Sequence, residues 1–139
     1  EQQPGGNYHA ETVSYDEATG ALTQELKHAY PADAHIESYR RTAVLNGSMA
    51  TITDVIRLTE PGEVAFHYLT ADKPEIDGTT IRFAFGHTAS FDPALVPSVN
   101  EIDLNHGNIS RTWKRDFLYR ITLTAANVKD AVYVLTIGK

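Results

Sequence analysis

Residues 36–69 read IESYRRTAVLNGSMATITDVIRLTEPGEVAFHYL, and this stretch decides the predicted fold. Three runs rich in β-branched and aromatic residues are separated by two turn signals, NGS at 46–48 and TEPG at 59–62. An Asn-Gly pair between β-branched runs is a strong hairpin signal. A proline followed by a glycine fixes one φ angle and frees the next, which suits a second turn. The stretch therefore predicts a three-stranded antiparallel meander.

Asp54 occupies an unusual position in the middle run of this meander. Side chains alternate along a strand, so Asp54 shares a face with Ile52 and Ile56 and should point inward with them. An unpaired carboxylate in an apolar row is costly, and a cationic or hydrogen-donating partner is therefore expected.

The hairpin register indicates where that partner lies. Pairing outward from the turn at 46–47 places residues 40–42 opposite residues 53–55. We therefore predict a structural ion pair in which Asp54 binds an arginine of the preceding strand. The candidates are Arg40 and Arg41, with Arg120 on a later strand and backbone N–H groups as alternative donors.

Length and composition exclude several classes of protein. A chain of 139 residues predicts a single domain, 1–139, and the linker-like opening EQQPGG suggests a flexible end at 1–7 of a domain cut from a larger protein. The net charge of −6 argues against a nucleic-acid partner. The absence of cysteine excludes disulfides, cysteine nucleophiles and Cys-type zinc sites. No apolar run approaches the ~18 residues of a membrane helix, so we expect no membrane association.

The rest of the chain predicts more short strands. A short helix competes with a strand over 21–28, and the segment 126–130 is expected to be a turn. About nine or ten runs spaced ~8–12 residues apart indicate an all-β fold, an antiparallel β-sandwich of short strands. Outside the meander, the expected strands are 8–16, 21–28, 79–85, 89–91, 99–104, 117–124 and 131–137, and a turn at 77–78 joins the two-residue piece 75–76 to 79–85.

The sequence carries no recognisable catalytic motif, so no catalytic residue is assigned. Six histidines are scattered without a metal-ligand spacing, and a single histidine in a strand is more often structural. Trp113 is the clearest candidate for substrate binding, because Arg111, Lys114 and Arg115 flank it. A tryptophan among cations could stack on an acidic sugar. The alternative is a loop residue that caps one end of the sandwich.

Three stretches resemble a known family. They are LTQELKHAYPADAHIESYRRTAVLN at 22–46, ATITDVIRLTEPGEVAFHYLT at 50–70 and RTWKRDFLYRITLT at 111–124. Their pattern is similar to the C-terminal β-sandwich region of heparinase II/III-like polysaccharide lyases. The resemblance implies a larger enzyme whose α/α-toroid carries most of the catalytic machinery for β-elimination at a uronic acid. It also implies a metal ion in the full-length protein, held by two histidines and an aspartate. His9 corresponds by position to one of those histidines.

The resemblance leads to an expected function. We expect a non-catalytic accessory domain, without a cofactor of its own, that supports the N-terminal α/α-toroid of the same parent chain. It could also line a cleft for acidic polysaccharide, and the expected location is the periplasm or exterior of a bacterium. A stand-alone carbohydrate-binding module and a structural interaction domain are the alternatives. Exposed coplanar aromatics beside Arg or Lys would favour the module, whereas a bare apolar face would favour a domain of a larger enzyme.

Overall fold

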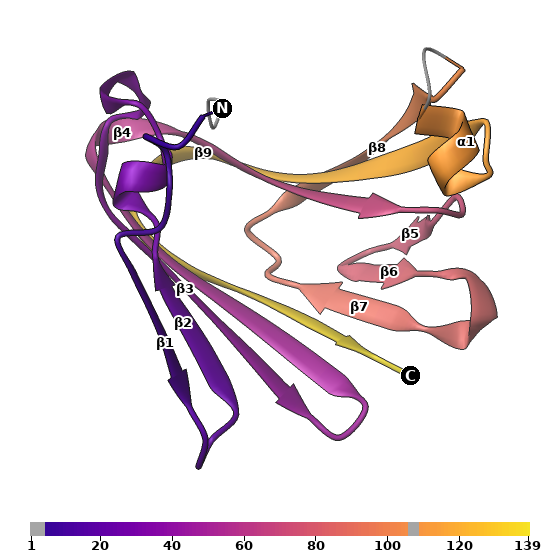
Figure 1. The fold of residues 1–139 in the computed structure, drawn as a ribbon, viewed down its shortest axis with the longest axis horizontal. Coiled ribbons are helices and arrows are strands. Elements are labelled where there is room, and N and C mark those ends of the chain that lie inside the picture. Colours follow the sequence, from indigo (N-terminus) through magenta and orange to yellow (C-terminus); the bar gives the residue numbers. More distant parts are fainter. Residues whose placement is uncertain (1–4, 106–108) are drawn as a thin grey trace.

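The described part of the chain folds into nine β-strands, all paired antiparallel. Figure 1 shows how these strands are arranged. The structure is a computed structural model that describes residues 5–105 and 109–139, apart from the side chains of Phe85, Ile109 and Arg111. The all-β, antiparallel sandwich predicted from the sequence is confirmed. The strands are β1 Thr12–Asp16, β2 Ala21–Glu25, β3 Ile36–Asn46, β4 Met49–Thr70, β5 Glu75–Asp77, β6 Thr80–Arg82, β7 Thr88–Phe91, β8 Val96–Asp103 and β9 Phe117–Gly138.

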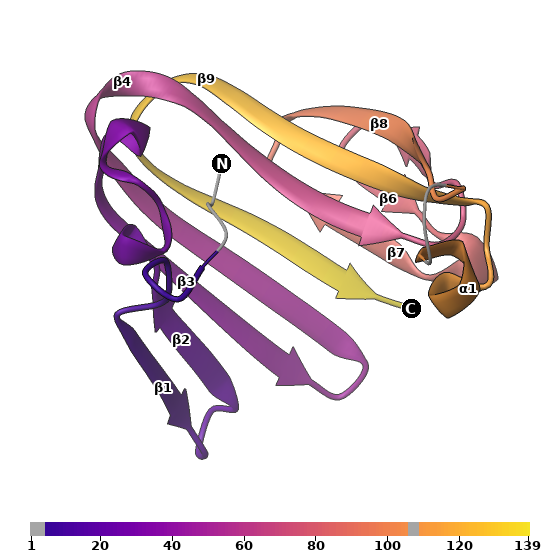
Figure 2. The same cartoon turned by 45° about the horizontal axis from the view of Figure 1, so that its top comes forward.

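Two strands of 22 residues each, β4 and β9, run through the whole molecule and bend midway (Figure 2). Their ladder runs from Ala50↔Ile137 to Thr70↔Tyr119, and its register shifts on both sides of Gly62. The bends divide the strands between two layers. The broad layer has the order β1-β2-β3-β4-β9-β7-β6-β5 and contains the first half of β4 and the second half of β9. The second half of β4, the first half of β9 and β8 form a narrow layer.

The turn predicted at the TEPG segment, 59–62, was wrong. The segment does not reverse the chain, because β4 continues through it and pairs with β9 on both sides. Pro61 has no N–H to donate, and it lies in the interval where ladder pairing lapses. A Cβ on Gly62 would lie 3.3 Å from Cδ1 of Leu58, so the tight bend favours glycine there. The segment therefore acts as a bulge that turns the strand from one layer to the other.

The predicted turn at 126–130 was wrong for a related reason. β9 is continuous through these residues, and Asn127 takes a left-handed φ of 57° as the strand bends. Asparagine tolerates this conformation better than most residues. Turn-forming residues thus mark a bend in each of the two long strands, and the bends lie opposite one another in the ladder.

The Asn-Gly hairpin is confirmed with the expected register. Arg40 lies opposite Val55 and Arg41 opposite Asp54. Asn46 still pairs with Met49, so Gly47 and Ser48 form the connection, and Gly47 supplies the positive φ of 61°.

The remaining strands differ from prediction mainly at their ends. The first strand begins at Thr12, and the second ends at Glu25 before two short 3-10 helices, η1 (Lys27–Ala29) and η2 (Ala32–Ala34). A third 3-10 helix, η3 (Ala84–Gly86), occupies the end of a predicted strand. The sequence NHGN at 105–108 also predicts a turn, and this stretch falls largely outside the described residues.

The core lies between the two layers. Phe66, Ile121 and Leu123 from the narrow layer pack with Tyr133 and Leu135 of the broad layer into one buried cluster. Phe66 and Tyr133 meet edge to face, with ring centroids 5.5 Å apart. The narrow layer has fewer strands than the broad one, so it leaves part of the broad layer uncovered (Figure 1).

The single α-helix of the described residues, α1 (Ile109–Trp113), has five residues. Within the described part of the chain, no helix is long and apolar enough to cross a membrane.

Candidate functional site

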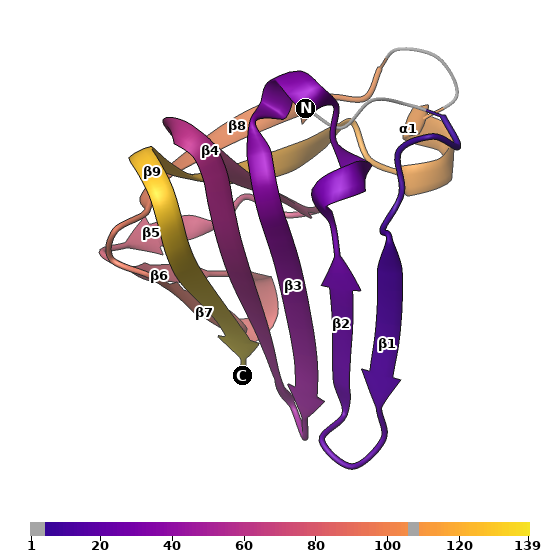
Figure 3. The same ribbon diagram turned by 90° about the vertical axis from the view of Figure 1, so that its left-hand side faces the viewer.

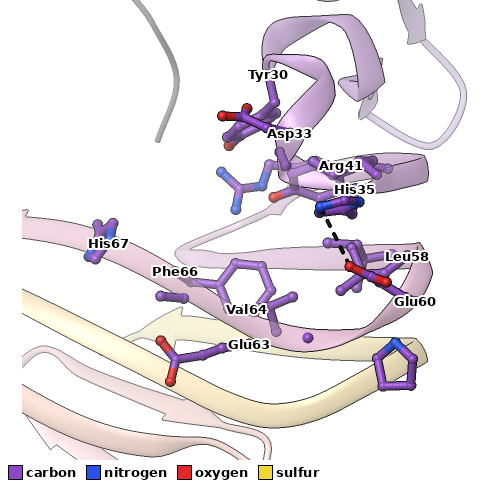
Figure 4. Close-up of a pocket in the computed structure, with 17 residues that line it drawn as sticks. Tyr30, Asp33, His35, Arg41, Leu58, Glu60, Glu63, Val64, Phe66 and His67 are labelled. Carbon is purple, nitrogen blue, oxygen red and sulfur yellow. Dashed lines mark ion pairs between the residues drawn. The ribbon is translucent and has the colours of Figure 1, made fainter.

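A pocket of about 710 Å³ lies where the bend of β4 faces the segment with η1 and η2 (Figure 4). Its floor is apolar and comes from both arms of the bent strand, with Ile56 and Leu58 before the bend and Val64 and Phe66 after it. A volume of this size with an apolar floor and a few polar groups is typical of ligand pockets. The polar side chains that line it are Tyr30, Asp33, His35, Arg41, Glu60, Glu63 and His67.

A buried ion pair stands at one wall of this pocket. Asp54 is only 3% exposed. Arg41 donates to it from Nε at 2.7 Å and from Nη2 at 3.0 Å, and the Tyr39 hydroxyl donates at 2.9 Å. The guanidinium of Arg41 also lies 5.9 Å from the centre of the Tyr39 ring. The Asp54 carboxylate therefore accepts three hydrogen bonds, two from the charged Arg41 and one from the neutral Tyr39 hydroxyl. A buried charge requires such partners.

The strand register explains why Arg41 is the partner. Arg41 and Asp54 are directly opposite in the β3–β4 ladder and so share one face of the sheet. Arg40 lies opposite Val55, on the other face, and is exposed. Arg120 lies opposite Leu69, beyond the bend, and is also exposed.

The tyrosines around this pair are held in their neutral form. Burial and the nearby Asp54 charge raise the pKa of Tyr39, and burial raises the pKa of Tyr30. Burial likewise raises the pKa of Tyr68 to about 12. Burial opposes the charge on Arg41, but its hydrogen bonds to Asp54 prevail and raise its pKa. Near neutral pH the tyrosines are therefore neutral and Arg41 is positively charged.

The pocket as a whole has an acidic lining. Asp33, Glu60 and Glu63 contribute carboxylates, whereas the charge of Arg41 is already balanced by Asp54. His35 lies 3.5 Å from Glu60 and would offset one carboxylate only when protonated. An acidic lining repels polyanions, so this pocket is poorly suited to an acidic polysaccharide.

Trp113 lies at the other end of the molecule, at the end of α1 (Figure 1). Its side chain is 52% exposed and available for stacking. The neighbouring cations differ in their availability. Lys114 is exposed with a φ of 52°, whereas Arg115 donates to Asp72 at 2.7 Å and to the Ala71 carbonyl at 3.3 Å. The side chain of Arg111 lies outside the described residues.

His9 is exposed, and its Nδ1 lies 3.1 Å from the carbonyl oxygen of Gly6. No group of three or more His, Cys, Asp or Glu side chains in the described residues is placed to hold a metal ion. His9 is therefore not part of such a group among the described residues.

Sequence reasoning missed most of the pocket. Tyr30 and His35 come from the segment before β3, whereas Glu60 and His67 come from the two sides of the β4 bend. These segments face each other only because β4 bends instead of reversing. Asp54 in its apolar row was the one signal that pointed to this region.

Comparison with known proteins finds a similar fold among solved structures. No family model and no curated protein sequence matches the chain. A solved structure of a heparinase III gene product with methylated lysines has a similar fold, with a TM-score of 0.67 and 12% sequence identity. The match covers 93% of this chain and 20% of that chain, so this chain spans about a fifth of the length of the heparinase. The chain thus has the fold of a heparinase-like domain.

The buried ion pair leads to a stability prediction. Asp54→Ala leaves the charge of Arg41 and the Tyr39 hydroxyl without their partner, which costs ~3–5 kcal/mol. At roughly 3 °C per kcal/mol for a chain of this size, thermal denaturation should show a melting temperature lower by about 10 °C or more. Asp72→Ala is the control, because Asp72 pairs with Arg115 at the surface and such pairs contribute about 1 kcal/mol or less. Equal melting of the two variants would contradict the structural role of Asp54.

The raised tyrosine pKa values predict a loss of stability at alkaline pH. Tyr68 ionises near pH 10 in the unfolded chain but at about 12 in the folded protein. The folded state therefore keeps a proton that the unfolded state loses, and the contribution is complete below pH 10 and is lost as pH rises from 10 to 12. Urea denaturation at a series of pH values should show this decline, and Tyr68→Phe should reduce its slope. An unchanged slope in the variant would exclude Tyr68 as its source.

Proposed function

We propose that this chain is a non-catalytic β-sandwich domain of a heparinase II/III-like polysaccharide lyase. The fold similarity to one fifth of a heparinase III supports the assignment to a part of a larger protein. In this proposal the parent enzyme is bacterial, acts in the periplasm or outside the cell, and performs β-elimination on a polysaccharide that contains uronic acid. The partner of this domain is the N-terminal α/α-toroid of the same parent chain.

A bare apolar face carries the proposal. Val13, Tyr15, Leu22 and Leu45 are 56%, 63%, 37% and 70% exposed, respectively. Tyr15 lies opposite Leu22 and Leu22 opposite Ala43, two residues from Leu45, so these side chains share the face that also carries Arg41. Soluble monomers seldom leave a contiguous apolar patch uncovered. A further domain that covers this face accounts for the patch.

The chemistry of the described residues supports a role without catalysis. β-Elimination requires a base that can take the C5 proton and a group that neutralises the uronate carboxylate. Tyr39 and Tyr68 hold their protons, and the half-buried guanidinium of Arg41 is occupied by Asp54. The domain would thus support the toroid and contribute at most one wall of the substrate cleft. Any metal ion of the full-length protein would take most of its ligands from elsewhere in the parent chain.

The proposal predicts that the isolated chain is inactive. Incubation with heparin, heparan sulfate or alginate should produce no rise in the ultraviolet absorbance of the unsaturated product, because among the described residues the guanidinium at the pocket, Arg41, is already paired with Asp54. A bacterial heparinase III under the same conditions is the positive control. A rise that scales with the concentration of this chain would overturn the assignment as a non-catalytic domain. An encoded α-helical segment of several hundred residues before this domain would support it directly.

One observation favours a carbohydrate-binding module as the second candidate, namely the exposed ring of Trp113 beside the exposed side chain of Lys114. If this surface binds acidic sugar, uronic-acid oligosaccharides at millimolar concentration should change the fluorescence of Trp113, the only tryptophan of the chain. The change should weaken as salt is added, since screening reduces the attraction to exposed cations. Lys114→Glu should weaken it further. An unchanged spectrum would assign Trp113 a structural role.

A further inference from the structure

The strand β1 ends the broad layer with one edge unpaired among the described residues (Figure 3). It pairs with β2 on one side, and all five of its residues are exposed. An unpaired edge presents N–H and C=O groups to which another extended chain can pair. Natural proteins usually protect such edges with proline, lysine, a bulge or a very short strand.

The other free edges of the sheet carry these protections, and β1 does not. β8 contains Pro97, β5 has only three residues, and the free edge of β4 beyond its bend follows Pro61 and a register shift. The sequence of β1 is TVSYD, with no proline and no lysine, and its ladder with β2 has no register shift. β1 is therefore the open edge at which β-pairing with another chain is least hindered.

The side chains of β1 fit an incoming strand. Val13 and Tyr15 lie on the same face as Leu22, next to the bare apolar face described above. Thr12 and Ser14 lie on the opposite, polar face. A new strand with alternating apolar and small polar residues would extend both faces without a change of pattern. Its apolar side chains would pack beside Val13 and Tyr15 and so extend the apolar face.

Charge at the two ends of β1 restricts which strand can pair. Glu11 precedes the strand, and Asp16 and Glu17 end it. Asp16 accepts hydrogen bonds from the Ala18 amide and the Thr19 hydroxyl, and these bonds lower its pKa and keep it charged. Among the described residues, Nδ1 of His28 lies 3.4 Å from a carboxylate oxygen of Glu11. In an antiparallel pair of two copies, Glu11 of one copy would face the Asp16–Glu17 end of the other, so self-pairing is repulsive.

We propose that β1 is a docking edge for an extended segment of another polypeptide, which adds to the sheet as its next strand. The segment alternates apolar and small polar residues and carries lysine or arginine at both ends, opposite the carboxylates at the ends of β1. Backbone hydrogen bonds provide most of the affinity, and the apolar side chains against Val13 and Tyr15 fix the register. The inference rests on the edge itself and holds whether or not the parent protein is a lyase.

A synthetic peptide tests this edge directly. The probe is an acetylated and amidated peptide of sequence KTVTVTK, and the matched control is ETVTVTE. Amide hydrogen exchange of the full chain, followed by NMR, should slow by about tenfold or more at outward-facing amides of residues 12–16 when millimolar KTVTVTK is present. ETVTVTE should leave these amides unprotected, because its ends repel the carboxylates. Protection by both peptides alike, or by neither, would overturn the proposal.

Two variants locate the binding. Tyr15→Glu places a charge at the apolar centre of β1 and should abolish protection by KTVTVTK. Val96→Glu is the matched control, because Val96 is equally exposed, at 69%, on the edge strand β8. This variant should retain the protection of β1. Protection of amides in β8 instead of β1 would overturn the proposal. If a variant fails to fold, the comparison of the two peptides on the unmodified chain still tests it. A positive lyase assay would contradict the proposed function without affecting this result.

Discussion

The long ladder between β4 and β9 is the constraint on which the structure depends. β3 attaches to β4, and β7 and β8 both attach to β9. Every other strand therefore joins the structure, directly or through its neighbours, at one of these two strands. Because both strands bend at the same level, one continuous ladder belongs to both layers and places their inner faces against each other. The core residues Phe66 and Tyr133 meet across this fold although they lie on the same pair of strands. The pocket is a direct consequence, since its floor is built from the two arms of β4 on either side of the bend.

This architecture explains which features could be predicted from sequence. Alternation of side chains gave the inward direction of Asp54, and the Asn-Gly turn gave the register that brings Arg41 to it, because both are local rules. The segments TEPG at 59–62 and ANVKD at 126–130 have the composition of turns. Composition alone cannot distinguish a chain reversal from a bulge within a strand. The deciding factor is the partner strand, which lies about 60 residues away in sequence for the pair Val64 and Ala125. The pocket depends on that long-range pairing, so its residues could not be grouped from sequence patterns alone.

The distribution of polar groups separates the two ends of the molecule. At the pocket, the charged groups are the paired Asp54 and Arg41, exposed carboxylates, and His35 beside Glu60. Near α1, Trp113 and Lys114 are exposed, and Arg115 is held by Asp72. A surface for acidic sugar would need the second arrangement, whereas the first suits contact with a protein that supplies cations. The two candidate functions thus use different ends of the sheet, and neither excludes the other on structural grounds.

The bare face of β1, β2 and β3 bears most strongly on the role of this domain. A net charge of −6 keeps the chain soluble, but it does not cover apolar surface. A partner that covered this face would bury Tyr15, Leu22 and Leu45. Full burial of an exposed leucine stabilises a complex by about 1.5–3 kcal/mol, before the free-energy cost of association is subtracted. The adjacent Arg41 and Asp54 already satisfy each other, so a partner could cover this face without stranding a charge. A stable interface between domains requires an apolar surface whose nearest charges neutralise each other. A soluble sugar offers hydroxyl groups instead, and this face has few groups that could form hydrogen bonds with them.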